Sequence, residues 1–481
     1  MKINLGTNYS SFAKAKMAES PILKRLQMAK VRCHSYPMDS LDFVLNDLEQ
    51  PESIRRQADM CNGDLTGRYL ELLTRSMDHD DMDEERLLLL FNRILKSKTR
   101  RGPVGKVFDE NSNEEFGPFS IAGKLFVGSL RHYLQTGNGK ALRIGEDLAE
   151  FFFSRMDEVK VHLDNLKKRE SYSMEVWVTE PMALLYAIKG DERCLEVCRM
   201  IADALPNTID GTHSHGFMTT LRGLQLAAIY TGDDSFNVLP EKFRAEIEEN
   251  AVWADGNISE TFPMSVRNEG CSIADWVMLN LYAGFITGKD EAYEKAERAM
   301  LNAFSLNQLV NGSFGHRLLD DDRCGYQQGE LVEEAWWCCV HDCGVGLIEY
   351  ANHAVTFRDG MIKVNLLVPG EYVFDIKGKK VTVNITSDYP ERANSIIFVS
   401  GEHEGIDVEI RVPEGIRNAK ILENEIAGGN RRYTLLGDMG YYLEDVAEGT
   451  ILKYGPLVMV PLRYMSRVEA YKEIKSAAPE G

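Results

Sequence analysis

The sequence predicts a mainly α-helical protein with a C-terminal β domain. Three observations support this: a repeated helix, glycine, helix pattern over roughly the first 350 residues, a change to short strands near Val355, and a length of 481 residues, which exceeds what a single core usually serves. We therefore expect a helical domain at residues 1–354, a β-sandwich domain at 355–468 and a polar tail at 469–481.

The helical part repeats one local pattern, in which an amphipathic helix ends at a glycine and another helix follows. Glycine just past a helix end adopts the left-handed conformation, and an Asn or Asp soon afterwards can cap the next helix. Successive glycines are 53, 42 and 56 residues apart (190 − 137, 232 − 190, 288 − 232), which is too irregular for a strict solenoid and favours a toroid of about twelve paired helices. The glycines are Gly137, Gly190, Gly232 and Gly288.

Strand patterns begin after Val355. Residues 357–368 and 372–385 each have the pattern of a strand, a hairpin turn and a second strand. Further alternating runs occur at 395–399, 408–412 and 451–460. Together these strands indicate a β-sandwich of roughly 100 residues, which is within the usual size of a domain.

Composition excludes several classes of protein. The first 24 residues lack the apolar run of a signal peptide and no stretch reaches transmembrane length, so we expect a cytoplasmic protein. Nine cysteines, an odd number without an export signal, indicate reduced thiols for metal binding or catalysis rather than a disulfide framework. A net charge of −19 disfavours nucleic acid and anionic membranes as partners.

Three cysteines and a glutamate form two tight clusters. Glu269 and Cys271 are near neighbours, and the pair Cys338 and Cys339 begins 67 residues later (338 − 271). Zinc accepts cysteine sulfur and glutamate oxygen, so these four residues can complete a tetrahedral site. Because adjacent cysteines rarely ligate one metal in regular structure, we expect a bent loop at a helix start there. Spacing alone fits an incidental core position for these thiols equally well, and the nearby Cys324 and Cys343 stay open as ligands.

Two further segments carry polar side chains suited to sugar chemistry. Glu260 lies nine residues before Glu269 (269 − 260), in a loop containing Gly and Asn. It is a candidate acid/base for glycoside hydrolysis. Taken alone, a loop glutamate is more often a solvated surface residue. His213 and His215 open a helix, and at this spacing they do not share a helical face. They suit contacts with sugar hydroxyls or, equally, a capping role.

Together these residues resemble glycoside hydrolase family 127, the β-L-arabinofuranosidases and their relatives. That family carries a Glu-Thr-Cys motif, a later Cys-Cys pair and an upstream glutamate in a Gly-rich loop, which stand here as residues 269–271, 338–339 and Glu260. Other matching segments follow in the same order from residue 64 to residue 458. They are 64–70, 293–302, 387–390, 411–413 and 454–458.

The resemblance implies an (α/α)6 barrel followed by β-sandwich material, with zinc held by Glu269, Cys271, Cys338 and Cys339. It also implies that Cys338 is the nucleophile and Glu260 the acid/base of a retaining hydrolase. In this reading zinc lowers the thiol pKa so that the sulfur can attack the anomeric carbon. Substrates are expected to be small glycosides or oligosaccharides, with L-arabinofuranosides as the leading candidates.

Departures from the family pattern bear on the sugar pocket. Lys124 stands where the family tends to have histidine, and we hypothesise that its ammonium favours an anionic or otherwise modified sugar. Core or surface placement of this lysine is the alternative. Trp177, next to carboxylates in the segment 175–180, is expected to stack on a sugar ring or to pack in the core. The segment between Glu260 and Glu269 is also shorter than usual.

Two other functions fit the same sequence. An α/α barrel also serves lyases and epimerases of acidic sugars, which would use His213, His215 or tyrosines and would work without zinc. Alternatively, the zinc is structural and the chain is a sugar-binding protein that has lost catalysis. In each case we expect a small carbohydrate as the partner, with neither nucleic acid nor membrane. A homodimer is compatible with the sequence.

Overall fold

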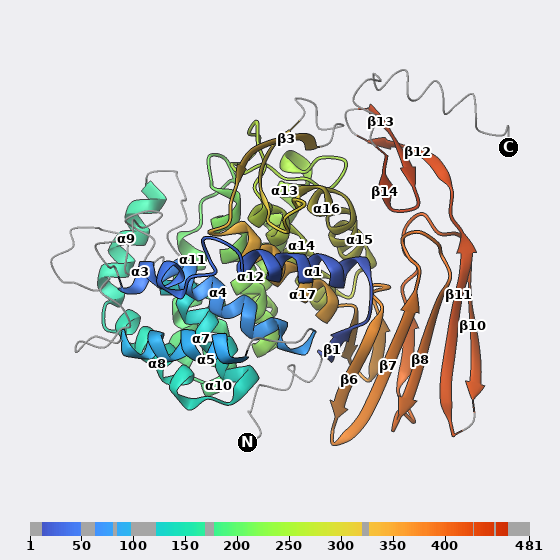
Figure 1. Ribbon diagram of the computed structural model, residues 1–481, viewed down its shortest axis with the longest axis horizontal. Helices are drawn as coiled ribbons and strands as arrows, with labels where there is room; N and C mark the ends of the chain where they lie inside the picture. Colours follow the sequence, from blue (N-terminus) through green and yellow to red (C-terminus); the bar gives the residue numbers. More distant parts are fainter. Residues whose placement is uncertain are drawn as a thin grey trace.

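The computed structural model describes residues 12–49, 63–79, 84–97, 122–168, 178–319, 327–426, 428–446 and 449–459. Figure 1 shows a body of helices and, beside it, a layer of long strands from the C-terminal part of the chain. Trp177, Cys324 and the predicted tail at 469–481 lie outside the described residues.

Six helices form a closed inner ring, in which each helix packs on the next and the last returns to the first. A second helix covers each of them from outside, so the expected (α/α)6 barrel is confirmed. The inner helices are α4 (Asp64–Arg75), α7 (Ala122–Thr136), α10 (Thr179–Lys189), α12 (Ser214–Thr231), α14 (Gly270–Thr287) and α17 (Cys339–Asn352). The outer helices, in the order of chain, are α1 (Pro21–Cys33), α5 (Glu84–Lys96), α8 (Gly139–Phe153), α11 (Glu192–Ala204), α13 (Val238–Ala251) and α15 (Asp290–Ala299).

The remaining helical segments are short connections or additions to the ring. They are α2 (Leu41–Val44), α3 (Asn46–Glu49), η2 (Ser76–Asp78), α9 (Met156–Lys168), η4 (Asp234–Asn237), the π-helical η5 (Met300–Phe304) and α16 (Ser305–Asn307).

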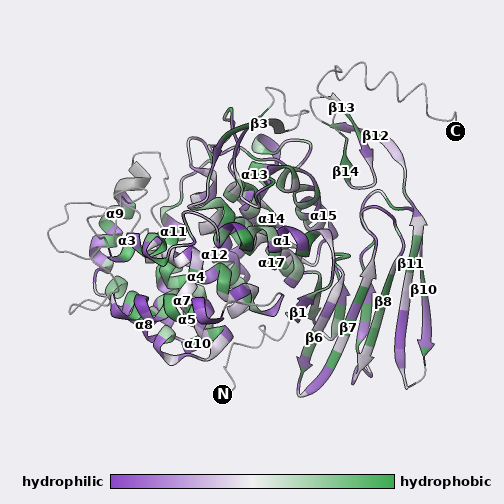
Figure 2. Ribbon diagram, viewed as in Figure 1, coloured by the Kyte–Doolittle hydropathy of each residue, from purple (hydrophilic) through white to green (hydrophobic). Residues whose placement is uncertain are grey.

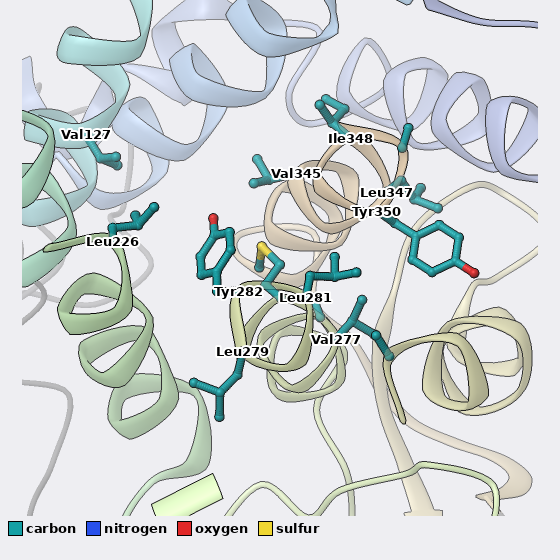
Figure 3. Close-up of a cluster of buried hydrophobic side chains, with 14 of the residues drawn as sticks. Val127, Leu226, Val277, Leu279, Leu281, Tyr282, Val345, Leu347, Ile348 and Tyr350 are labelled. Atoms are coloured by element: carbon teal, nitrogen blue, oxygen red, sulfur yellow. The ribbon is translucent and has the colours of Figure 1, made fainter. Parts of the chain in front are cut away.

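The core is centred on inner helices that are apolar on nearly every side. Every residue of α14 from Gly270 to Phe285 is buried, as expected for a helix enclosed by neighbours rather than one with a solvent face. Figure 3 shows side chains of α14 and α17 packed together, with Val127 of α7 and Leu226 of α12 nearby. This packing fixes the two helices whose first residues carry the predicted zinc ligands.

Glycines end the predicted helices as expected. Four of them have φ between 70° and 72°, the left-handed conformation that favours glycine. In three of the four turns the next Asn or Asp accepts a hydrogen bond from the backbone N–H two residues on, which caps the following helix. The glycines are Gly137, Gly190, Gly232 and Gly288.

The β region contains a six-stranded antiparallel sheet in the order β1-β6-β7-β8-β11-β10. Figure 2 shows hydrophobic and hydrophilic residues alternating along its central strands, as expected for a sheet with one face toward a core. Its strands are β1 (Lys14–Met17), β6 (Gly370–Ile376), β7 (Lys379–Ser387), β8 (Ser395–Gly401), β10 (Arg417–Ile426) and β11 (Asn430–Asp438).

Two smaller sheets and a hairpin complete the strands. In the first sheet, β4 and β5 form an antiparallel hairpin and β9 pairs in parallel with β5. The second sheet has the order β12-β13-β14, and β2 pairs with β3 between the last barrel helices. The bounds are β2 (Gly315–Leu319), β3 (Gln327–Glu334), β4 (Val355–Arg358), β5 (Met361–Val364), β9 (Asp407–Ile410), β12 (Tyr441–Val446), β13 (Gly449–Tyr454) and β14 (Leu457–Val458).

Several strands were not predicted from the sequence. β1 comes from the N-terminal segment but pairs with β6, with Lys14 opposite Val373. Its four residues are too few to stand out as an alternating run. The residues of β10 are all exposed, so this strand lacks the alternation of apolar and polar residues that marks a half-buried strand.

A buried ion pair joins the barrel to the β region. The guanidinium of Arg411, which follows β9, lies 2.9 Å from a carboxylate oxygen of Glu297 on α15. The Nε of Arg411 also donates to the backbone oxygen of Asn365, 2.5 Å away. Both charged side chains are almost fully buried. The barrel and the β region are therefore held together at this contact by charge as well as by apolar packing.

Candidate active site

The predicted site residues lie at the first turns of inner barrel helices. Each inner helix alternates with an outer helix that returns the chain, so the inner helices run in the same direction and their N-termini meet at one end of the barrel. His213, Glu269 and Cys338 are the N-cap residues of α12, α14 and α17. Helix N-termini carry partial positive charge, so this end of the barrel favours carboxylates and thiolates.

The four predicted zinc ligands come together. Glu269, Cys271, Cys338 and Cys339 are buried, and their ligand atoms all lie within 4.8 Å of one another. The Sγ atom of Cys339 is 3.4 Å from that of Cys271 and 3.6 Å from that of Cys338. The Sγ atom of Cys338 is 3.7 Å from Oε1 of Glu269.

These separations match a tetrahedral zinc site. Zinc–sulfur bonds of about 2.3 Å at tetrahedral angles place two sulfurs about 3.8 Å apart. The observed sulfur separations are close to that edge length and far above the roughly 2.05 Å of a disulfide bond. The residues present therefore fit a zinc ion in both chemistry and spacing.

The backbone explains how two adjacent cysteines can face one ion. Cys338 has φ −130° and ψ −64° and precedes the helix, whereas Cys339 is the first residue of α17. A turn over residues 336–338 leads into this position. The bent segment expected at a helix start is present, and it turns both thiols toward the first turn of α14.

Exposure separates Cys338 from its neighbours. Its relative exposure is 7%, against 0% for both Cys271 and Cys339. Hydrogen bonds from the thiols of Cys271 and Cys339 lower the pKa of Cys338 well below its usual value, whereas burial raises the pKa of each of those two thiols. Cys338 is thus the thiol of the set that combines a small residual exposure with stabilisation of its charged form.

His213 lies between the predicted zinc ligand Glu269 and the predicted acid/base Glu260. Its Nε2 is 3.3 Å from Oε2 of Glu269, and ligand atoms of all three residues lie within 4.8 Å of one another. Burial opposes the charge on both partners of the ion pair, but their mutual hydrogen bond outweighs it. The pKa of Glu269 is lowered and that of His213 is raised.

Glu260 is held from two sides by residues that sequence reasoning missed. Arg267 forms a two-pronged ion pair with its carboxylate, with Nη2 2.9 Å from Oε1. His316 of β2 lies on the other side, with Nε2 3.7 Å from Oε1. The backbone oxygen of Glu260 accepts hydrogen bonds of 2.9 Å from the N–H and hydroxyl of Ser214. Nothing in the spacing of Arg267 or His316 indicates these contacts.

A buried charge network lies next to the thiols. Asp342 of α17 accepts hydrogen bonds from Arg68 and from Lys124, the latter at 3.0 Å. His215 lies 3.3 Å from Asp342 through Nε2 and 2.5 Å from Asp275 through Nδ1. Ligand atoms of His215, Cys271 and Asp342 lie within 4.8 Å of one another, so the network adjoins the candidate zinc site. Asp275 was not singled out from the sequence. The signal that could have found it is that it is a lone Asp in the apolar sequence of α14.

Lys124 and His215 are buried within this network rather than on the surface. Burial and the charge of Arg68 lower the pKa of Lys124 to about 8. The ammonium is bonded to Asp342, and a contact of either residue with a sugar stays a prediction, as does the preference for an anionic sugar.

A sequence model of the β-L-arabinofuranosidase GH127 catalytic domain matches residues 34–344, well over half of the chain. The chain belongs to glycoside hydrolase family 127. This membership agrees with the resemblance seen in the sequence, and with the site geometry at the barrel end it makes the protein a glycoside hydrolase. No curated protein matches the chain.

Solved structures of GH127 enzymes share the fold of this GH127 protein. A GH127 β-arabinofuranosidase is 14% identical with a TM-score of 0.69, over 93% of this chain and 84% of that one. A GH127 β-L-arabinofuranosidase from Geobacillus stearothermophilus T6 is 13% identical with a TM-score of 0.70, over 92% and 86% of the two chains. A third glycoside hydrolase is 16% identical with a TM-score of 0.66, over 92% and 83%.

Among the residues that the structure describes, no helix of this GH127 protein is long and apolar enough to cross a membrane. Cys343, which the sequence left open as a ligand, is buried on α17 and belongs to none of the groups of potential metal ligands found in the described part of the chain.

Proposed function

We propose that this protein is a retaining glycoside hydrolase of the β-L-arabinofuranosidase type, with Cys338 as nucleophile and Glu260 as acid/base. The observation that carries the proposal is the exposure difference within the four-donor set. All three thiols are buried, but Cys338 keeps a relative exposure of 7% where the other two have 0%, and Glu260 lies beside the set on the adjoining loop. L-Arabinofuranosides on small glycosides or oligosaccharides are the proposed substrates, in keeping with the family.

Glu269, Cys271, Cys338 and Cys339 are the residues that would hold zinc. When bound, zinc keeps the cysteine ligands ionised at neutral pH. A four-ligand zinc site normally reads as structural, because catalytic sites keep an open position. In our proposal the thiol that ligates is also the group that reacts, so an open position is not needed.

The reaction has two halves. In the first, the sulfur of Cys338 forms a bond to the anomeric carbon as the bond from that carbon to the leaving oxygen breaks, and Glu260 donates its proton to the leaving oxygen. In the second, Glu260 removes a proton from water, the water oxygen attacks the anomeric carbon, and the carbon–sulfur bond breaks. The thiolate and the protonated glutamate are restored, and two inversions give net retention.

Arg267 sets a requirement on the first half of the reaction. Its two-pronged ion pair occupies both carboxylate oxygens of Glu260, whereas acid catalysis needs one of these oxygens to face the leaving oxygen of the substrate. Arg267 therefore has to turn away from Glu260 when substrate enters. Its side chain is partly exposed at this edge of the site, which gives it room to do so.

Substitution of the nucleophile tests the proposal directly. Cys338→Ser should lower kcat by at least about a thousandfold, in line with the loss of an essential nucleophile, while the fold and much of the zinc remain. The control is Cys198→Ser, a buried thiol on α11 outside the four-donor set, which should keep its activity. More than a tenth of wild-type activity in Cys338→Ser would exclude the nucleophile assignment.

A substrate screen separates the competing functions. Nitrophenyl glycosides, including the β-L-arabinofuranoside, should be hydrolysed with retention by the wild-type protein, and a zinc chelator should abolish the activity. Turnover of acidic sugars that survives both chelation and thiol alkylation would favour the lyase or epimerase alternative. Thermal stabilisation by sugars without any product would favour a non-catalytic sugar-binding protein.

A further inference from the structure

A cavity of about 270 Å³ lies where α13, α14 and α15 meet loops of the β region. Two tryptophans, four glutamates, a lysine and an arginine line it. None of its lining residues belongs to the candidate active site. Its volume is near the lower end of the range for small-molecule pockets, which is about 300–1,000 Å³.

Two polar groups in the cavity have no protein partner within the described part of the chain. Trp276 is 1% exposed and lines the cavity, yet no described group accepts a hydrogen bond from its indole N–H. Glu294 of α15 likewise has neither a hydrogen bond nor an ion pair to a described residue. Burial raises the pKa of Glu294, and the nearby Glu414 adds to this effect. A buried donor and a partly exposed acceptor, both without partners among the described residues, favour a ligand that supplies both.

The cations of the cavity wall are already neutralised. Lys295 lies 2.7 Å from Glu291 and 3.6 Å from Glu248. Arg298 lies 3.1 Å from Glu414, also on the wall. Their remaining N–H groups are donors that carry little net charge, so an anion gains little from them.

The wall itself is preformed. Gly256 has φ 79°, and a Cβ atom there would lie 2.6 Å from Cα of Ala299, so the loop is packed closely against the end of α15. The backbone N–H of Trp253 donates to the backbone oxygen of Asn257 at 2.9 Å, which closes this loop into a tight turn. A preformed wall reduces the entropy lost when a ligand binds.

The chemistry of the lining selects among ligand classes. A small cation needs only acceptors and an anion needs only donors, whereas a sugar hydroxyl is both donor and acceptor. The cavity offers the acceptor Glu294 and the donors Trp276, Lys295 and Arg298 at one place. We propose that this cavity binds one neutral sugar ring, at a site separate from the candidate active site.

Binding in solution tests the proposal with the full-length protein. L-Arabinose, D-galactose and D-glucose are titrated one at a time by calorimetry, with spermidine and inorganic phosphate as cationic and anionic comparators. At least one sugar should bind, and Glu294→Leu should weaken its affinity at least tenfold. Glu249→Leu, on an exposed position of α13 outside the cavity, is the matched control and should leave affinity unchanged.

Lys295→Met provides a second variant if Glu294→Leu does not fold, and it should also weaken binding by losing a donor at the wall. Crystals soaked with the sugar that binds most tightly should show it in the cavity, which separates this site from binding at the barrel end. The proposal is overturned if no sugar binds, if affinity does not depend on Glu294 and Lys295, or if the soaked sugar lies only near Cys338. Preferential binding of spermidine or phosphate would overturn it as well.

Discussion

Our proposal gives different roles to the individual residues of the four-donor set. Cys271 has no exposed surface and lies 3.4 Å from the sulfur of Cys339, so it has no route to a substrate. In our proposal its part in the site is to bind metal. Cys338 differs from Cys271 by a small exposed area, and our proposal assigns the reacting role to Cys338 on that basis.

We predict that Cys271→Ala loses zinc. Removing one of four ligands should lower the metal content, measured by mass spectrometry, from about one zinc per chain to well below half. Cys343→Ala is the matched control, because this buried thiol of α17 lies outside the donor set and its loss should leave zinc unchanged. Equal zinc in the Cys271 variant and the wild type would remove Cys271 from the site.

At this scale the sequence predicts which donor residues come together better than it predicts the residues around them. Glu269 and Cys271 were singled out because they are close in sequence and match a motif of the family. Arg267 and His316 reach Glu260 only because of the pairing of β2 with its neighbours and the path of a loop. Tertiary contacts of that kind have no local pattern. Lys124 was hypothesised to face a sugar, with a core or surface position as the alternative. Its hydrogen bond to Asp342 could likewise not be predicted from the spacing of residues in the sequence.

Among the elements, α4 and α7 approach unusually closely. A Cβ atom at Gly67 of α4 would lie 2.2 Å from the backbone nitrogen of Leu125 in α7. The absence of a side chain at Gly67 therefore sets the distance between the two helices. These helices also carry Arg68 and Lys124, which both bond Asp342, so the close approach positions part of the buried network.

We predict that Gly67→Ala destabilises the protein. The added methyl group must push apart two backbones, and overpacking of this kind costs about 1–3 kcal/mol in the free energy of unfolding. Gly139→Ala is the control, because a Cβ at this first residue of α8 meets no atom within 4 Å and alanine favours helix. Denaturant unfolding measures both variants, and equal stabilities would contradict the packing argument.

The strand β1 is attached to the barrel through a histidine that must stay neutral. The backbone N–H of Met17 donates to Nδ1 of His79 at 3.4 Å, which requires an unprotonated ring nitrogen. Burial lowers the pKa of His79 from the usual 6.5 to about 4. The unfolded chain therefore binds a proton more readily than the folded one between these two values. Stability from this group is complete above about pH 6.5 and is lost as the pH falls toward 4.

We predict that His79→Gln reduces the acid sensitivity of folding. A difference of about 2.5 pKa units corresponds to at most about 3 kcal/mol at pH 4, and the variant should lack this share of the loss in the free energy of unfolding between pH 7 and pH 4. Urea unfolding at several pH values in this range measures it. Identical pH dependence in variant and wild type would show that His79 does not contribute.

Helices, strands and turns could be predicted where the sequence pattern that specifies them is local. The four glycine turns and the hairpins near residues 360 and 378 were expected from sequence, and the structure has left-handed residues at these turns. β10 and β1 were not, because one is exposed along its whole length and the other has only four residues. Their pairing comes from neighbours in the sheet rather than from their own pattern.

At the scale of the whole molecule, the barrel and the β region depend on the buried pair Arg411 and Glu297. Two charges taken out of water are tolerated only because they face each other, with Asn365 satisfying a further N–H of the arginine. Removing one partner leaves the other charge buried and unpaired. The join between the two parts of the chain is thus sensitive to a single side chain.

We predict that Glu297→Gln lowers the free energy of unfolding by about 3–5 kcal/mol, the usual effect of breaking a buried ion pair. Glu19→Gln is the control, because Glu19 forms an ion pair with Lys24 in which both side chains are largely exposed. Exposed ion pairs contribute about 1 kcal/mol or less to the free energy of unfolding. Both are measured by denaturant unfolding. A loss below 1 kcal/mol in Glu297→Gln would show that the pair is dispensable.

The pairing of β1 with β6 has a consequence for synthesis of the chain. Residues 14–17 leave the ribosome early, but their partners at 370–373 are made 356 residues later (373 − 17). At about 5–20 residues per second this interval lasts about 20 to 70 s. All six inner helices of the barrel are translated in the meantime. β1 therefore cannot pair fully with β6 until nearly four-fifths of the polypeptide has been made.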